Sequence, residues 1–332
     1  MGSLTRAERL HASLSWQNGR RTATRSFWEK FDCGTALAAA AVLVAVGWTV
    51  VAEDPSRPLA TENSAAGASD GGLDDARARR AEIAEKVRYR GGESMLGAYG
   101  GSPYTYASDV TLRGPNVDMT VHGVDWEGRP FTSPIYYGIR IQRWLKQSAI
   151  GGMIDFTHSK VYSPMEQKTR YSGTRDGKPV PTEGKISDQF HKLEFTHGHN
   201  MLTANALWRL PLRGAFISPY VGVGLGISLP HSEVQLKGAT GRTYEYQYTG
   251  PAAQVLVGVE LRMPRLSYFG EYKLTYASYQ VPLWNRDGAW VLQDLWTQFR
   301  RWLGGGQPDN GWAATKLLSH QGIAGMGVRS NP

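Results

Sequence analysis

The sequence predicts an all-β protein: an eight-stranded antiparallel transmembrane β-barrel that follows an N-terminal signal sequence and a periplasmic leader. Residues 217–227 show the clearest pattern, because aliphatic side chains alternate there with three glycines. Segments 135–142 and 255–262 alternate aliphatic residues with glycine, polar and charged residues. A soluble sandwich fills its inner face with bulky side chains, whereas a membrane barrel turns its aliphatic face to lipid and keeps its lumen small or polar.

The first 52 residues contain an uncharged run, 33–52, that follows four basic residues and ends in Val-Val-Ala. This arrangement predicts a secretory signal peptide over 1–52 with cleavage after Ala52. About 20 apolar residues also suffice to span a bilayer, so an uncleaved signal anchor is the alternative. The only cysteine, Cys33, precedes the apolar core. The chain therefore offers no disulfide, no cysteine-based metal site and no acylation site after that core.

Residues 53–93 are rich in Ala, Ser, Asp, Glu and Arg. They lack enough apolar residues for a core of their own, so we expect a partly disordered periplasmic leader. Residues 1–52 carry six basic and three acidic side chains, so their removal lowers the formal net charge from +8 to +5. A positive charge of this size fits the phosphates of lipopolysaccharide as a partner and fits ordinary solubility equally well.

The remaining segment, 94–332, alternates short and long breaks between its strands. The short breaks are 145–148, 211–215 and 263–265, and the long ones are 113–134, 159–190, 230–243 and 282–315. Bacterial membrane barrels have even strand numbers, short periplasmic turns and long external loops. The pattern predicts eight strands with both ends in the periplasm. Their expected ranges are 94–112, 134–144, 149–159, 190–210, 216–229, 244–262, 266–281 and 316–329.

A barrel of eight strands has an interior about wide enough for side chains, which excludes a general pore. The alternation places one set of charged residues inward: Arg140, Asp155, Glu194, Glu260, Arg262, Glu271 and Lys273. Glu194 belongs to this set only if the fourth strand slips its phase once, and a bulge near Gly198 would produce that slip. Buried charges need partners, so the simplest interpretation of the set is a lumen salt-bridge network.

Eight short stretches between about residues 95 and 283 provide a further signal. Two of them are Asp-Phe-Thr-His-Ser-Lys-Val-Tyr at 155–162 and Leu-Glu-Phe-Thr-His-Gly-His-Asn at 193–200. The others are 126–129, 133–140, 218–222, 230–234, 244–252 and 269–276. In their order and spacing these stretches resemble the rhizobial lipid A oxidase family. The chain departs from that pattern at His197 and His199, and in an aromatic and basic insertion over 284–315.

The resemblance implies a monomeric barrel in the cell outer membrane that oxidises the proximal glucosamine of lipid A to 2-aminogluconate. Molecular oxygen would be the co-substrate, and no nucleotide cofactor or nucleic acid is implied. The expected partners are lipid A or lipopolysaccharide and the barrel-assembly machinery. Two alternatives stay open: a non-catalytic small barrel with a structural or ligand-binding role, and a lipid A deacylase. The deacylase would rest on His158 and Ser159, which as strand neighbours point to opposite sides.

Oxidation of a sugar hemiacetal needs a base, and also a route for electrons to oxygen that side chains do not readily provide. The candidate catalytic residues are Asp155, His158, Glu194, Glu271 and Lys273. His158, His197 and His199 are candidate ligands for a divalent metal, although loose histidines at a rim are also ordinary solvent-facing residues.

Phosphate recognition suggests a second set of residues. The loop 159–190 carries six basic and four acidic residues. Arg140, Lys160 and Arg170 are the candidate substrate-binding residues, because basic side chains bind phosphate through charge-assisted hydrogen bonds. A mixed-charge solvated loop is the alternative. Residues 289–303 predict an amphipathic helix with Leu292, Trp296 and other apolar residues on one face. That helix would lie at the outer-leaflet interface or plug the barrel mouth.

Overall fold

A computed structural model describes residues 78–79, 92–145, 148–210, 216–239, 241–283 and 290–330, without the side chains of residues 196 and 197. The predicted signal segment 1–52 lies outside the described residues, as does the leader apart from 78–79 and 92–93. Among the helices in the described part of the chain, none combines the length and the hydropathy needed to cross a bilayer.

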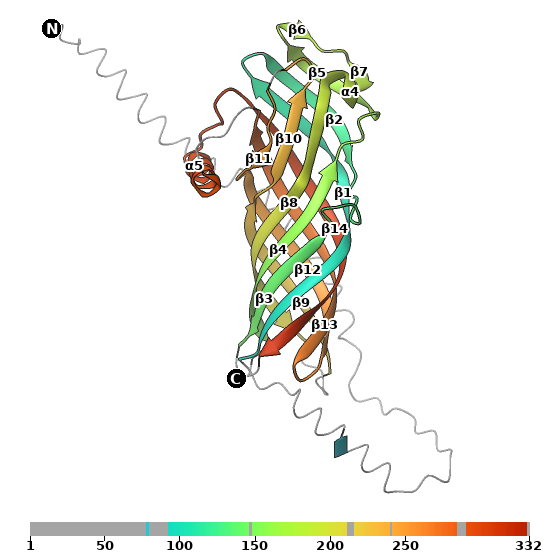
Figure 1. The fold of residues 1–332 in the computed structure, drawn as a ribbon, viewed down its shortest axis with the longest axis vertical. Helices are drawn as coiled ribbons and strands as arrows, with labels where there is room; N and C mark the ends of the chain where they lie inside the picture. Colours follow the sequence, from blue (N-terminus) through green and yellow to red (C-terminus); the bar gives the residue numbers. More distant parts are fainter. Residues whose placement is uncertain are drawn as a thin grey trace, which may run out of the picture.

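Eight long strands in the described residues close into a ring, in which each strand is antiparallel to both neighbours (Figure 1). In ring order they are β1 (Ser94–Gly114), β3 (Tyr137–Trp144), β4 (Ile150–Tyr162), β8 (Phe190–Arg209), β9 (Ile217–Ser228), β12 (Gly250–Arg262), β13 (Leu266–Pro282) and β14 (Trp312–Ser330). Leu96 of β1 lies opposite Ile141 of β3 and Val328 of β14, so the first strand closes the ring. The eight predicted strands are confirmed.

Shorter elements extend the upper end of this ring. They are β2 (Val117–Trp126), β5 (Lys168–Arg175), β6 (Lys178–Pro179), β7 (Glu183–Lys185), α4 (Ile186–Gln189), β10 (His231–Leu236) and β11 (Glu245–Tyr246). The strand β2 pairs with β1 and β5, and β10 pairs with β8 and β11. Three predicted loops therefore contain strands. The predicted strand 244–262 is wrong in its first part, because β11 and β12 are separate strands.

The described strands divide into two regions. We call residues 94–105, 137–158, 200–209, 217–228, 252–277 and 317–330 the lower barrel, and the strands above them the cap. The cap encloses the largest apolar core, which includes Val121, Phe195 and Val281. The lower barrel has two small apolar clusters, around Phe269 and Leu256, that flank buried charges.

The passage from one region to the other is marked by irregular strands. The pairing of β1 shifts register between Thr105 and Thr111, and the inward phase changes there from odd to even positions. Ser159 of β4 pairs with His199 of β8, and Val161 pairs with Phe195, so β8 has two more residues than β4 between these pairs. The extra residues lie around Gly198, which has a φ of +140°. An insertion of two residues leaves the alternation of β8 unchanged.

The irregularity near Gly198 is therefore confirmed, but its predicted consequence is wrong. Leu193 and Phe195 face inward and are each 2% exposed, whereas Glu194 turns to the outer face of the cap. The apolar face of β8 changes sides because its surroundings change, not because the strand slips.

The predicted amphipathic helix is confirmed as α5 (Val291–Leu303). It lies outside the barrel wall rather than in the barrel mouth, so the plug alternative is wrong (Figure 1).

Candidate functional site

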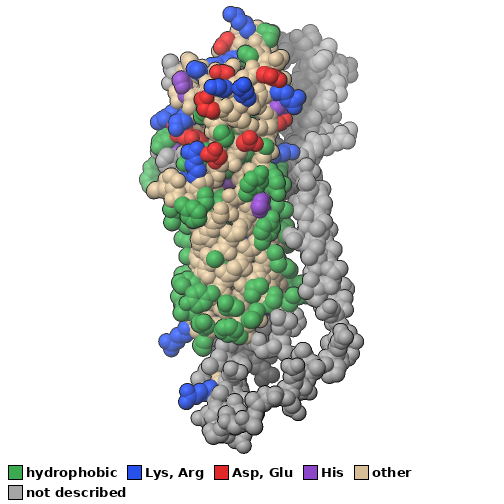
Figure 2. Space-filling model, turned by 90° about the vertical axis from the view of Figure 1, so that its right-hand side faces the viewer, with side chains coloured by type: hydrophobic (Ala, Val, Ile, Leu, Met, Phe, Trp, Pro, Cys, Tyr) green, Lys and Arg blue, Asp and Glu red, His purple; other side chains and the backbone are tan. Residues whose placement is uncertain are grey.

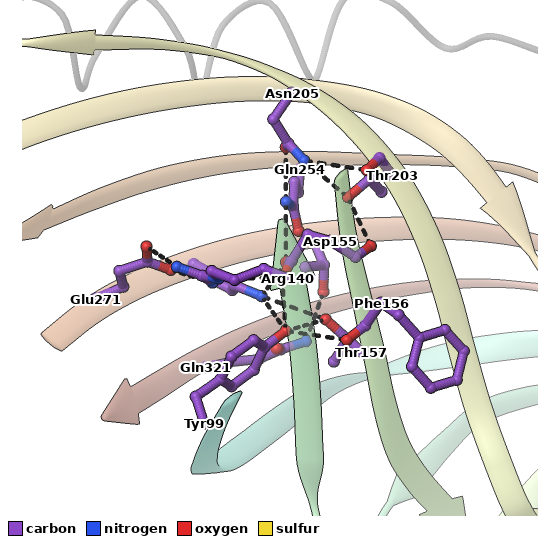
Figure 3. A network of polar contacts seen from close by, with 12 residues as sticks. Tyr99, Arg140, Asp155, Phe156, Thr157, Thr203, Asn205, Gln254, Glu271 and Gln321 are labelled. Carbon is purple, nitrogen blue, oxygen red and sulfur yellow. Dashed lines mark hydrogen bonds and ion pairs between the residues drawn. The ribbon is translucent and has the colours of Figure 1, made fainter. Parts of the chain in front are cut away.

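A buried network of polar side chains fills the lower barrel, with Asp155 of β4 near its centre (Figure 3). The carboxylate of Asp155 accepts hydrogen bonds from Lys273 Nζ at 2.6 Å and from the Tyr99 hydroxyl at 3.1 Å. Arg140 Nε lies 3.3 Å from Asp155 Oδ1. Thr157 extends the network through a 2.7 Å contact with the Tyr99 hydroxyl. These groups come from strands β1, β3, β4 and β13, which the closed ring brings together.

Glu271 is the second carboxylate of the network. It accepts hydrogen bonds from both terminal nitrogens of Arg140, one of them at 2.8 Å, and from the Tyr220 hydroxyl. The Arg140 guanidinium lies between two rings, 4.6 Å from the centroid of Tyr99 and 4.5 Å from that of Phe269. The side chains of Arg140, Asp155, Glu271 and Lys273 are all 0% exposed. Their formal charges cancel, so this set needs no further counter-ion.

Glycine and amide side chains complete the packing around these charges. A Cβ at Gly138 would lie 1.8 Å from Cζ of Tyr99, so only a glycine leaves room for that ring. Gln254 donates to Asn205 Oδ1 at 2.6 Å and to Asp155 Oδ2 at 3.3 Å. The network is thus held from several strands at once, which is what a buried charge requires.

A second ionic cluster closes the lower end of the barrel. Glu93, the residue before β1, is bound by Arg209 at 3.3 Å and by Arg329 at 2.8 Å, and it also contacts Arg262. The last residue of the predicted leader is therefore part of the barrel interior. Sequence analysis found Arg262 but missed the other three members.

The rim residues lie where the lower barrel meets the cap. His158 Nδ1 lies 2.7 Å from Asn200 Oδ1, and its ring stacks on Tyr137 with a centroid distance of 4.8 Å. His199, the next residue before Asn200, faces the interior and contacts the Tyr279 hydroxyl. We call His158, Asn200 and Tyr137 the outer rim cluster, because Tyr137 is exposed and all three share the outward phase of their strands.

The structure brings together four of the predicted site residues: Arg140, Asp155, Glu271 and Lys273. It does not bring Glu194 to them, because this side chain pairs with Lys192 at 2.9 Å on the outer face of the cap. The prediction that Glu194 points inward is wrong. His158 and Ser159 point to opposite faces of β4, as expected of strand neighbours, so they do not form a Ser/His pair.

The predicted substrate-binding residues lie apart from one another. Arg140 is sealed in the lower barrel, and Arg170 is exposed on β5 of the cap. Lys160 donates a hydrogen bond to the Thr132 carbonyl at 2.8 Å. Burial, together with the nearby Arg129, lowers the pKa of Lys160. These three residues do not form a single phosphate site.

The predicted metal ligands are only partly described. His158 and His199 lie on opposite faces of the paired strands β4 and β8, and the side chain of His197 lies outside the described part of the structure. Within the described residues, no group of three or more His, Cys, Asp or Glu side chains is placed to hold a metal ion.

Sequence analysis missed Tyr99, Gln254 and Tyr220, which bind the buried charges. The signal for them was available, because each alternates with outward aliphatic residues: Tyr99 follows Ala98, and Gln254 precedes Val255. Neutral polar residues on the inward face of a strand, and not only charged ones, therefore indicate a buried polar network.

Comparison with known proteins gives limited information. No protein-family model matches the chain, and no curated protein matches it. Several solved structures are similar, among them the following three. The outer membrane protein OprG from Pseudomonas aeruginosa has 8% identity and a TM-score of 0.38, covering 74% of this chain and 99% of that chain. The N-terminal β-barrel domain of Pseudomonas aeruginosa OprF has 10% identity and a TM-score of 0.29, covering 72% and 98%. Neisserial surface protein A has 9% identity and a TM-score of 0.27, covering 69% and 96%. TM-scores this low assign the chain neither a family nor a function.

Proposed function

We propose that the chain is an outer-membrane β-barrel that acts on lipid A at the outer rim of its membrane-spanning part. The observation that carries the membrane assignment is the outward face of the lower barrel, which exposes aliphatic side chains on every strand of the ring. They include Leu96, Ile139, Ile141, Ile154, Leu202, Val223, Leu225, Val257, Leu266 and Val328. A surface this apolar around a charged interior is the arrangement that lipid favours and water does not.

The distribution of charge supports the same placement. On the face shown in Figure 2, acidic and basic side chains gather over the cap, while hydrophobic side chains surround the lower barrel. At the upper edge of the apolar surface, Tyr104, Tyr106 and Tyr272 gather around His320, with ring centroids 5.1–5.7 Å from it. Aromatic rings of this kind collect at membrane interfaces. Because short turns face the periplasm in such barrels, the cap lies outside the cell.

The lumen supports activity at the rim rather than transport. The four charged side chains of the central network are unexposed and pair with one another, and the Glu93 cluster fills the lower end. A barrel of eight strands has no space beyond such side chains.

Oxidation of the proximal glucosamine of lipid A, with molecular oxygen as co-substrate, is the activity that we propose. It rests on the resemblance to the rhizobial lipid A oxidases. Supporting it, stretches that carry the resemblance contact one another: 133–140 meets 155–162 in the Tyr137–His158 stack, and 155–162 meets 193–200 in the His158–Asn200 contact. Within the outer rim cluster Tyr137 is exposed, whereas His158 and Asn200 are 5% and 4% exposed, so the cluster meets the edge of the apolar surface through Tyr137, where the sugar of a lipid A molecule would lie.

Mass spectrometry of lipid A from cells with and without the protein, grown with and without oxygen, tests this activity. The proposal expects a gain of one oxygen atom only when the protein and oxygen are both present. Replacement His158→Ala should abolish the gain, and His122→Ala, a histidine of the cap outside the resembling stretches, should preserve it. Heat-modifiable migration on gels checks that both variants fold. An unchanged lipid A mass in cells that hold the folded parent protein would contradict the oxidase proposal.

A non-catalytic barrel is the second candidate, and the mutual pairing of the four charges in the central network favours it. In that case the lipid A mass does not depend on the protein, and changes to Asp155 or Lys273 alter stability alone. Loss of an acyl chain would point to a deacylase.

A further inference from the structure

The helix α5 contacts the barrel through polar side chains and through two aromatic rings. Asp294 and Gln298 are 2% and 5% exposed, and Gln298 Oε1 accepts a hydrogen bond from the backbone N–H of Tyr248 at 2.6 Å. The rings of Phe299 and Trp302 pack on Tyr248 with centroid distances of 5.2 and 5.6 Å. These contacts fix the rotation of the helix about its axis.

The opposite side of α5 is apolar and exposed. Leu292 is 71% exposed, and Trp296 and Leu303 are each 59% exposed; Trp290, just before the helix, is 72% exposed. In water an amphipathic helix turns its apolar side to the protein and its polar side outward, because burial of each large apolar side chain contributes about 1.5–3 kcal/mol. On α5 the exposed side carries Leu292, Trp296 and Leu303 beside the polar Gln293 and Arg300. Three large apolar side chains are thus left uncovered, which favours surroundings other than water.

The position of α5 identifies those surroundings. Tyr248 lies two residues before β12, whose outward side chains Val257 and Val259 belong to the apolar surface of the lower barrel. The helix also borders Gln280 and Pro282 at the upper end of β13. Figure 1 shows it outside the wall, near the height at which the cap begins. Its apolar side therefore continues the lipid-facing surface at its upper margin.

We propose that α5 is an interfacial helix that lies in the outer leaflet, with Leu292, Trp296 and Leu303 among acyl chains and Arg300 beside lipid phosphates. Tryptophan and arginine on the exposed part of such a helix suit the boundary between acyl chains and headgroups. The inference rests on the proposed membrane placement of the barrel but not on the proposed oxidase activity. In this proposal the insertion over 284–315 widens the contact of the barrel with the lipid that surrounds the outer rim.

Site-specific fluorescence in vesicles tests the proposal. The full chain with Cys33→Ser receives one cysteine for an environment-sensitive label: Leu292→Cys on α5, Ile139→Cys on the lower barrel, or Lys178→Cys on the exposed cap hairpin. Each labelled protein is reconstituted in phosphatidylethanolamine–phosphatidylglycerol vesicles, with doxyl-labelled lipid or aqueous iodide as the quencher. A helix inserted about 5–10 Å into the interface should lose about half of its Leu292 fluorescence to doxyl lipid and little to iodide.

The three positions separate the possible results. Quenching by doxyl lipid at both Ile139 and Leu292, with quenching by iodide at Lys178, supports the proposal. Quenching by doxyl lipid at Ile139 but by iodide at Leu292 overturns it and leaves the barrel placement intact. Quenching by iodide at Ile139 overturns the barrel placement and the proposal together. Formation of a disulfide-linked dimer by the unlabelled Leu292→Cys variant in vesicles would assign the apolar side to a second copy of the chain and overturn the proposal.

Discussion

The strand β8 passes through both regions of the molecule and carries opposite chemistry in each. Its inward positions hold Thr203 and Asn205 in the lower barrel and Leu193 and Phe195 in the cap, all nearly unexposed. Its outward positions hold Leu202, Ala204 and Trp208 below, and Lys192 above. One continuous strand therefore has a polar interior and an apolar exterior at one end, and the reverse at the other. The difference is what the proposed membrane placement requires: lipid outside the lower barrel and water outside the cap would each favour the side of the strand that is apolar there.

The two regions are also stabilised differently. The cap is held by burial of apolar side chains, as a soluble protein is. In the lower barrel many of the buried side chains are charged, amide or hydroxyl groups, and stability depends on whether each finds its partner. Substitutions of matched type should therefore have different consequences in the two regions.

The largest expected effect comes from breaking the central network. Replacement Asp155→Asn leaves Lys273 without its carboxylate and removes one partner of Arg140. Leaving a buried charge unpaired costs about 3–5 kcal/mol, so the free energy of unfolding should fall by that amount. Urea unfolding of the barrel in lipid vesicles measures it.

The double variant Asp155→Leu with Lys273→Met is the matched control, because it removes one cation and one anion and leaves Arg140 paired with Glu271. It should recover most of the lost stability. If the double variant is as unstable as the single one, the network is not held by charge pairing.

The next effect tests the core of the cap. Replacement Leu193→Ala should cost about 2–5 kcal/mol, because it leaves a cavity in a packed apolar cluster. The matched variant is Leu202→Ala, at an outward position of the same strand in the lower barrel. Its loss in the free energy of unfolding should be clearly smaller, since lipid would fill the space left by the side chain. Equal losses in the two variants, measured by the same unfolding titration, would mean that Leu202 is packed as Leu193 is.

A charged side chain on the outer face should destabilise the lower barrel, whereas the outer face of the cap should tolerate either a charged or an apolar side chain. Replacement Val257→Arg places a charge in lipid and should destabilise the barrel by about 2–4 kcal/mol if the position lies near the bilayer midplane. An outer-face change in the cap, Lys168→Val, should alter stability by no more than about 0.5 kcal/mol. Folding yield and unfolding in vesicles check both variants, and a tolerated arginine at 257 would argue against lipid at that position.

Much of the lower barrel could be predicted from the sequence because its pattern is local. Alternation of aliphatic or aromatic residues with glycine, polar or charged ones fixes which side of β3, β4 and β13 faces inward, and it predicts Arg140, Asp155, Glu271 and Lys273 in the lumen, where the structure has them. Closure of the ring then brings them together, although no sequence spacing shows which acid meets which base.

The strands of the cap could not be predicted from alternation in the same way. Val117, Met119 and Val121 alternate with polar residues as regularly as the lower strands do, but the long external loops of membrane barrels favour a loop at this position. Glu194 was misplaced for a related reason. The apolar residues of β8 move to the inner face in the cap, as the proposed change from lipid to water outside the wall requires, and in the sequence that change resembles a phase slip.

The central claim is that lipid surrounds the lower barrel and water surrounds the cap. Its most direct test is an accessibility scan with single spin labels along β12, from Ala252 to Leu261, in reconstituted vesicles. The account predicts that access to oxygen, which dissolves in lipid, oscillates with a period of two and peaks at Val255, Val257 and Val259. It also predicts that a water-soluble nickel reagent reaches Lys168 and Arg170 of the cap but none of these peaks. Nickel access at Val257 equal to that at Lys168 would contradict it.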